Sequence, residues 1–179
     1  MNFSIQHPLE NERAILYPLN ESDFDLLYAI ASDPAVWEQH PNKDRWKKEV
    51  FHVFFDGAMQ SKGAFKIMDK NTGKIAGSTR FYDYDEAESR IFIGYTFYGK
   101  EYWGTGFNTS VKRLMLSYIF QYVDQVCFHI GAYNIRSQIA IERLGAVKTG
   151  EQEITYFGEM PKLNFVYSIT KSENTGPII

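Results

Sequence analysis

Residues 95–108, YTFYGKEYWGTGFN, are the most informative part of this chain because they join a strand to a helix through two glycines. The first residues are apolar and strand-forming, and the residues after Gly106 begin a long amphipathic pattern. Gly104 and Gly106 lack the Cβ atoms that would keep an anion away from the backbone. The first amides of a helix have no carbonyl partner, so this junction is expected to bind a diphosphate. Two glycines alone are weak evidence, because many strand-to-helix turns need them for conformation only.

Composition places the chain among single-domain proteins. Its 179 residues can bury one sizeable core, and 19 Lys+Arg against 22 Asp+Glu give a formal charge of -3. This charge provides no global field for nucleic acid or an anionic membrane, so neither partner is expected. The single cysteine, Cys127, excludes an internal disulfide and fits a reducing compartment. The four histidines share no metal-ligand spacing, so no metal is expected.

No targeting or membrane segment is visible. The first residues lack a basic region followed by an apolar stretch, and no window of about 18 apolar residues occurs. A cytoplasmic protein is therefore expected. A single domain over residues 13–171 is predicted, with an N-terminal segment at 1–12 and a mobile tail at 172–179.

Hydrophobic periodicity predicts alternating strands and helices. The predicted strands are 13–19, 64–68, 75–84, 91–97, 126–132, 147–156 and 163–169, and the predicted helices are 20–32, 44–59, 105–122 and 134–144. Residues 35–41 are expected to form a loop or a short helix. Asn71-Thr72-Gly73 predicts a hairpin turn, and Gly145 predicts a left-handed helix end. The result is a meander of antiparallel strands that leads into the glycine turn.

Four short motifs occur in order along the chain. They are Gly94-Tyr95, Tyr102-Trp103-Gly104-Thr105-Gly106, Asn134-Ile135-Arg136-Ser137 and Leu144-Gly145-Ala146. Together with the element order, they make residues 13–171 resemble the GCN5-related N-acetyltransferase (GNAT) superfamily. Within it, the chain resembles the branch of ribosomal-protein N-terminal acetyltransferases, the RimJ/RimL type. The resemblance implies an α+β fold with a mixed, mostly antiparallel sheet of about seven strands and about four helices, splayed between the fourth and fifth strands.

The chain departs from the superfamily pattern at several positions. Glu101 stands at the first position of the Gln/Arg-x-x-Gly-x-Gly/Ala signature, so its side chain is expected to point away from the diphosphate. Ser110 stands where many relatives carry Glu, and Phe92 and Ile93 stand where many carry an acid before the strand-end glycine. The position that usually holds the general base therefore lacks one.

The resemblance implies direct acetyl transfer from acetyl-CoA to a primary amine, either a protein N-terminus or a small amine, in a ternary complex. Backbone amides of the glycine turn would hold the diphosphate, and unpaired groups of the preceding strand would pair with pantetheine. The implied coenzyme residues are Tyr95, Thr96, Phe97, Trp103, Gly104, Thr105, Gly106, Phe107, Asn108, Asn134 and Ser137. A bulge in the strand could direct one N–H at the thioester oxygen.

The resemblance also implies catalytic candidates. Ser137 occupies the family position for returning a proton to the CoA thiolate, although Asn134 and Ser137 are equally typical helix caps. Glu151 and Glu153 are candidate bases on the sixth predicted strand, and Tyr156 could orient a water or the amine. The acids of the turn at 83–89, Asp83 and Glu88 among them, are alternatives, although such a turn is usually only solvated.

Trp37, His40, Trp46 and Asp83 are the candidate acceptor-binding residues, with core packing as the alternative for the tryptophans. An open cleft near Trp37 and Trp46 would suit a peptide, and a closed aromatic box with an acid would suit a small cation. Cys127 and His129 share a strand face and are expected to pack rather than react. The alternative function is a non-catalytic acyl-CoA-binding module. A monomer or homodimer is expected.

Overall fold

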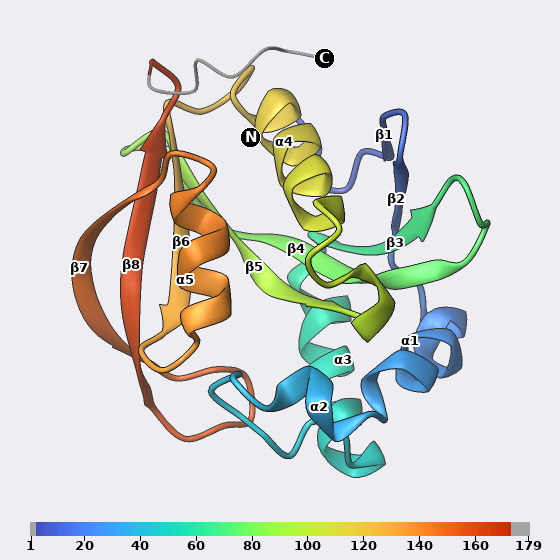
Figure 1. The fold of residues 1–179 in the computed structure, drawn as a ribbon. Coiled ribbons are helices and arrows are strands. Elements are labelled where there is room, and N and C mark those ends of the chain that lie inside the picture. The colour runs from blue at the N-terminus through green and yellow to red at the C-terminus, as the bar shows by residue number, and fades with distance from the viewer. Residues whose placement is uncertain (1–2, 173–179) are drawn as a thin grey trace.

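One eight-stranded sheet organises residues 3–172, the part of the chain that this computed structural model describes. The strand order is β1-β2-β3-β4-β5-β6-β8-β7 (Figure 1). The strands are β1 (Leu9–Glu10), β2 (Ala14–Pro18), β3 (Ala64–Asp69), β4 (Ile75–Asp85), β5 (Arg90–Tyr98), β6 (Gln125–Gly131), β7 (Val147–Ile154) and β8 (Lys162–Thr170). The α-helices of this part are α1 (Phe24–Ala31), α2 (Pro34–Trp37), α3 (Lys48–Ser61), α4 (Phe107–Ile119) and α5 (Ile135–Glu142). All strand pairs are antiparallel except β5 with β6, so the predicted mixed, mostly antiparallel sheet is confirmed.

Local side-chain chemistry accounts for two elements beyond the predicted number. β1 lies inside the predicted N-terminal segment and pairs with β2, because the Asn11 side chain accepts the N–H groups of Arg13 and Ala14 and closes a tight turn. α2 forms where a loop or short helix was predicted, since the Asp33 carboxylate accepts the Ala35 N–H and Pro34 begins the helix. Residues 173–179 of the predicted tail lie outside the described part of the chain.

Helices cover both faces of the sheet (Figure 1). The N-terminal helices α1, α2 and α3 pack on one face, and the later helix α4 packs on the other. The alternation along β3 shows the division, because Phe65 packs with α4 while its neighbour Ala64 packs with α1, α2 and α3. Phe65 is fully buried, and burying a side chain of this size contributes about 2–3 kcal/mol. Two cores therefore hold β4 and β5 rigidly between α3 and α4.

The only parallel pair of strands in the described sheet separates after a short contact. β5 and β6 pair through residues 90–92 and 125–127 and then diverge (Figure 1). Beyond Phe92, the β6-facing edge of β5 has no strand partner. The predicted splay is confirmed, and in the observed numbering it lies between β5 and β6.

Candidate active site

A cavity of about 700 Å³ lies between β5 and β6, where the two strands diverge. β5 and β6 form its walls, and the glycine turn, the start of α4, the start of α5 and the segment after α2 complete its lining. The cavity therefore follows from the sheet topology, because two strands that separate leave their edges and one face of each helix uncovered.

The glycine turn closes one end of this cavity. Gly104 and Gly106 have φ values of 72° and 77°, in the left-handed region that other residues rarely adopt. Gly106 is the N-cap of α4, so the amides of the first helical turn, including that of Asn108, have no carbonyl partner within the helix. The Asn108 Oδ1 atom is buried and has no hydrogen-bond partner in the described residues. The open turn fits an anionic group, and the unpaired Asn108 Oδ1, which can only accept, fits a ligand that also carries a hydrogen-bond donor, as the amides of a coenzyme do.

Two arginines, Arg13 and Arg136, contact the glycine turn. The Arg136 guanidinium lies 3.9 Å from the centroid of the Trp103 ring, and Arg136 and Arg143 both line the cavity. Arg13 donates to the carbonyl of Thr105 from the outer side of the turn, at 3.4 Å. No Asp or Glu is among the residues that line the cavity. The sequence analysis quoted Arg136 as part of the Asn134–Ser137 motif but gave it no role. No local sequence feature near Arg13 predicted its contact with the glycine turn.

A bulge in β5 shapes the middle of the cavity. Ser78 of β4 pairs with Phe97 and Arg80 pairs with Gly94, so Thr79 alone faces the two residues Tyr95 and Thr96. Tyr95 has a φ of 52°, which is rare for a residue other than glycine. The Arg80 guanidinium packs on Tyr95 from the α3 face of the sheet, with its central carbon 3.8 Å from the centroid of the Tyr95 ring. The structure therefore contains a bulge in the strand segment where the sequence analysis placed one.

Lys112 of α4 lies directly behind this bulge. Its Nζ donates to Thr96 Oγ1 at 2.6 Å and to Thr79 Oγ1 at 3.0 Å, and the side chain is buried although it lines the cavity. Burial lowers the pKa of Lys112 to about 7. The sequence analysis missed this residue. The helical spacing could have indicated its burial, because Lys112 lies three residues before Met115 and therefore on the apolar face of α4.

The start of α5 places two predicted residues in the cavity lining. The Asn134 Oδ1 accepts the Ser137 N–H at 3.1 Å, so Asn134 caps the helix. The Ser137 hydroxyl lines the cavity, and it makes no hydrogen bond with another part of the described chain. Capping by Asn134 thus leaves the Ser137 hydroxyl available to a ligand.

Aromatic and imidazole groups line the end of the cavity opposite the glycine turn. Tyr156 lies in the loop after β7, donates from its hydroxyl to Asn164 Oδ1 at 2.7 Å and packs edge-on against Tyr95. His129 Nδ1 lies 3.1 Å from the Tyr82 hydroxyl, and its Nε2 has no partner in the described residues. Burial lowers the pKa of His129 to about 4 and that of His40 to about 3. Both imidazoles are therefore neutral at physiological pH.

Comparisons with known proteins agree with this geometry. The family model of the acetyltransferase (GNAT) domain matches residues 13–147, more than half of the chain. The chain belongs to the GNAT acetyltransferase family. The uncharacterized N-acetyltransferase p20 of Bacillus licheniformis is 27% identical over 117 residues, an alignment that spans 63% of this chain and 65% of that protein. This chain thus spans just under two thirds of the length of that curated relative.

Solved structures of GNAT proteins share the fold. A GCN5-related N-acetyltransferase from Brucella melitensis has a TM-score of 0.81 at 22% identity, over 94% of this chain and 80% of that one. The spermidine N-acetyltransferase from Vibrio cholerae, solved with CoA and spermine, has a TM-score of 0.70 at 13% identity, over 93% of this chain and 100% of that one. At these identities the likeness concerns the fold alone.

The GNAT cavity brings together most, but not all, of the residues named from the sequence. Those that line it are Tyr95, Thr96, Phe97, Trp103, Gly104, Gly106, Asn108, Asn134, Ser137, Tyr156 and His40. Thr105 is exposed outside the lining and accepts the Phe107 N–H, and Phe107 is buried in the core beneath it. Glu101 is exposed and lies outside the lining, as its expected outward orientation requires.

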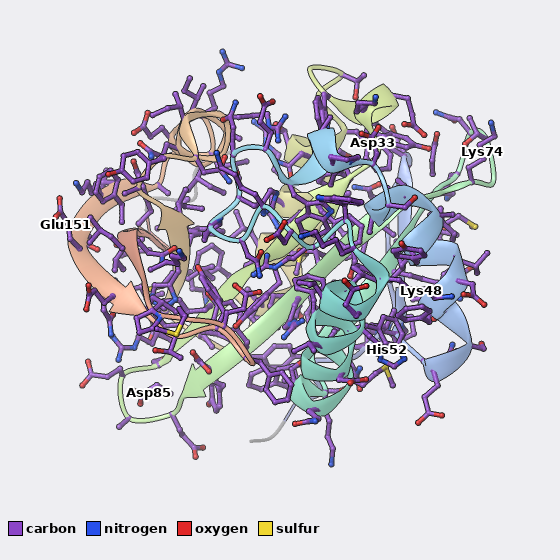
Figure 2. The ribbon with its side chains drawn as sticks, turned by 90° about the horizontal axis from the view of Figure 1, so that it is seen from below. Asp33, Lys48, His52, Lys74, Asp85 and Glu151 are labelled. Atoms are coloured by element: carbon purple, nitrogen blue, oxygen red, sulfur yellow. The ribbon has the colours of Figure 1, made fainter. Side chains whose placement is uncertain are left out.

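The named carboxylates and tryptophans lie elsewhere. Glu151 and Glu153 are exposed on β7, and Glu151 pairs with Lys148 at the outer edge of the sheet (Figure 2). β8 separates β7 from β6, so carboxylates on β7 are one strand too distant to reach the cavity. Asp83 lines a separate hollow beside the β4–β5 turn, the turn that carries Asp85 in Figure 2.

The two tryptophans, Trp37 and Trp46, lie outside the cavity lining. Trp37 is fully buried and donates from Nε1 to the Ala31 carbonyl at 2.7 Å, because it fills the core between α2 and α3. Trp46 is exposed outside the cavity lining.

In residues 3–172, no helix is both long and apolar enough to cross a bilayer. The same residues contain no group of three or more His, Cys, Asp or Glu side chains placed to hold a metal ion.

Proposed function

We propose that this protein transfers an acetyl group directly from acetyl-CoA to a primary amine, with both substrates bound at once. The observation that carries the proposal is the cavity between the separated strands β5 and β6, which ends at the open glycine turn of α4. A ligand that is anionic at one end and extended along a strand edge fits both features.

The coenzyme would be held by backbone groups at one end and by the strand edge along its length. The amides of Asn108 and Thr109 in the first turn of α4 face the diphosphate, and Arg136, which stacks on Trp103, supplies positive charge beside it. The unpaired edge of Tyr95–Phe97 receives the pantetheine amides as an added strand would. In this proposed arrangement the thioester would lie near the bulge of β5.

Proton transfer falls to polar groups in the lining. Ser137 returns a proton to the departing CoA sulfur, because its hydroxyl lines the cavity and is free of other hydrogen bonds in the described chain. Tyr156, held by Asn164, orients the acceptor amine. With Glu151 and Glu153 outside the cavity, His129 is the group proposed to take the proton of the amine, because it lines the cavity, is neutral at physiological pH and has no partner for Nε2 in the described residues.

The charges of the lining favour an acceptor with no more than one positive charge. Arg45 reaches the cavity and is paired with Glu159 at 2.7 Å, and no Asp or Glu contributes to the lining. A polyamine would find no carboxylate to replace its lost hydration. The acceptor class proposed here is thus an amino-terminal peptide or a small monoamine, unlike the polyamine named for the Vibrio cholerae relative.

Predictions about the family branch, the cellular location and the assembly accompany the proposed activity. The four motifs support assignment to the RimJ/RimL-type branch, and the composition supports a cytoplasmic protein with one domain over residues 13–171. A monomer or homodimer remains the predicted assembly. Within the cavity lining, neither a metal nor any further cofactor is required for direct transfer.

The test combines binding and turnover in one plate. Thermal shifts with acetyl-CoA and CoA report binding, and thiol release against N-terminal peptides, monoamines and spermidine reports transfer. We expect stabilisation by both ligands and release that depends on a peptide or monoamine. Stabilisation with no release against any amine would favour the acyl-CoA-binding alternative, and a folded protein with no shift would overturn the coenzyme site.

A further inference from the structure

Lys112 of α4 is a buried lysine that has no carboxylate partner in the described chain. The side chain is 2% exposed, and its described hydrogen bonds go to the two hydroxyls of Thr79 and Thr96 rather than to a carboxylate. Burying a charged ammonium without an opposite charge destabilises a fold. The two threonine oxygens already lie 2.8 Å apart, so they can satisfy each other without the lysine. A costly group that no structural partner requires is typical of a functional site.

Among the described residues, no carboxylate pairs with Lys112. α4 packs against β4 and β5, which present the hydroxyls of Thr79 and Thr96 to the Lys112 Nζ, and the Thr79 hydroxyl also lies 3.7 Å from the sulfur of Met115 on α4. Arg80, next to Thr79 on β4, donates to the Gly57 carbonyl of α3 on the opposite face of the sheet. The hydrogen bonds of Lys112 in the described chain therefore go to the bulge in β5 and to the β4 residue opposite it.

Thr96 connects this charge to the cavity. When Lys112 is protonated, the hydroxyl oxygen of Thr96 accepts from it, since an ammonium can only donate. The Thr96 proton is left with Thr79 Oγ1 or with the Gly94 carbonyl at 3.3 Å, a long contact that a better acceptor can displace. Thr96 lines the cavity at the bulge, whereas Thr79 is fully buried behind it.

We propose that the Thr96 hydroxyl donates a hydrogen bond to the thioester carbonyl oxygen of the acyl donor, and that Lys112 is the positioning residue that orients and polarises this hydroxyl. The inference rests on the proposed acetyl transfer. In that reaction the amine nitrogen bonds to the carbonyl carbon, the carbon–sulfur bond breaks, the amine loses one proton and the CoA sulfur gains one. Thr96 and Lys112 exchange no proton and stabilise the negative charge that develops on the oxygen.

The test compares Lys112→Met, Thr96→Val and the double variant with wild type. Removing one donor to a developing oxyanion lowers kcat by about 100-fold in other enzymes. We expect a loss of roughly 30- to 300-fold in kcat for each single variant, with the Kd for CoA within about threefold of wild type. Because the two residues act through one hydrogen bond, the double variant should lose little more than either single variant. Lys112→Arg, which keeps the charge, should recover part of the rate.

Matched controls separate this role from packing. Thr79→Val removes the other hydroxyl bonded to Lys112 but not the one in the cavity, so its loss in kcat should be at least tenfold smaller. Arg113→Met changes the exposed neighbour on α4 and should leave kcat unchanged. Since the folded-state pKa of Lys112 is lowered to about 7 from 10.5, the lysine destabilises the fold below pH 10.5, and fully so below about pH 7. Lys112→Met should therefore raise Tm at pH 6 and raise it less at pH 9.

Each outcome is decisive. Full activity in Lys112→Met, or multiplicative losses in the double variant, would overturn the inference while the proposed transfer stands. A lower Tm with weaker CoA binding in Lys112→Met would show a structural role and would also overturn it. A wild type that binds CoA but turns over no amine would overturn the proposed function and this inference together.

Discussion

The Arg136 guanidinium stacks on the Trp103 ring and so connects the first turn of α5 to the glycine turn before α4. Both segments line the cavity that the separation of β5 from β6 opens. A cation–π contact of this kind contributes about 0.5–2 kcal/mol. The pair thus presents a positive charge to the cavity beside the glycine turn.

Arg136→Ala should weaken CoA binding by about tenfold, because it removes both the charge and the contact that holds the Trp103 ring. Isothermal titration measures the Kd, and the difference from wild type should shrink as salt increases. Arg113→Ala is the matched control, since Arg113 is exposed on α4 and outside the lining. Equal affinity in Arg136→Ala and wild type at low salt would contradict the assignment.

Gly106→Ala should destabilise the protein and impair coenzyme binding. A non-glycine residue at a φ of 77° costs about 1–2 kcal/mol, and relief of this strain would displace the backbone that presents the first amides of α4; the added Cβ itself would lie 3.6 Å from Arg13 Nη1. We expect Tm to fall by about 2–8 °C and CoA to give a smaller thermal shift. Gly150→Ala on β7 is the control, because a Cβ there meets no atom within 4 Å. A variant with wild-type CoA affinity would show that the helix amides do not hold the diphosphate.

Acidification should destabilise the fold through His129 and His40. Their folded-state pKa values of about 4 and 3 lie below the ordinary value of 6.5, chiefly because burial penalises the charged imidazole. Between pH 6.5 and 4 the unfolded chain binds more protons than the folded one, so stability is lost as pH falls. Urea unfolding at pH 7 and pH 4.5 measures the loss. The His40→Gln, His129→Gln double variant should reduce it, whereas His52→Gln on the exposed face of α3 (Figure 2) should not.

Ser137→Ala should lower kcat by about 100-fold and leave stability nearly unchanged. The Ser137 hydroxyl bonds to no other described group, and the helix cap uses its backbone N–H. Asn134→Ala is the informative contrast, because it removes the cap and should cost about 1 kcal/mol of unfolding free energy. Thiol release and urea unfolding on both variants separate the two roles. Wild-type kcat in Ser137→Ala would leave the departing sulfur to be protonated by water.

Features of the chain that depend on neighbouring residues could be predicted from the sequence. Gly104 and Gly106 adopt the left-handed conformations that their turn requires, and Asn71–Gly73 forms the expected hairpin between β3 and β4. Asn134 caps α5, and the splay and the bulge lie at the expected strand. Each of these depends on local backbone geometry or on the order of strands, which the pattern of residue types records directly.

The remaining features depend on packing between distant segments. Glu151 and Glu153 do not reach the cavity because β8 inserts between β6 and β7, an order that the sequence of strands along the chain does not reveal. Trp37 is withdrawn into the core because α2 faces α3, and Arg13 reaches Thr105 across 92 residues. Lys112 became the unpaired charge behind the bulge only when α4 closed over β4 and β5. The sequence by itself determined the coenzyme turn, since that is local; tertiary packing decided which charges surround the reaction, because each is set by contacts between residues far apart in the chain.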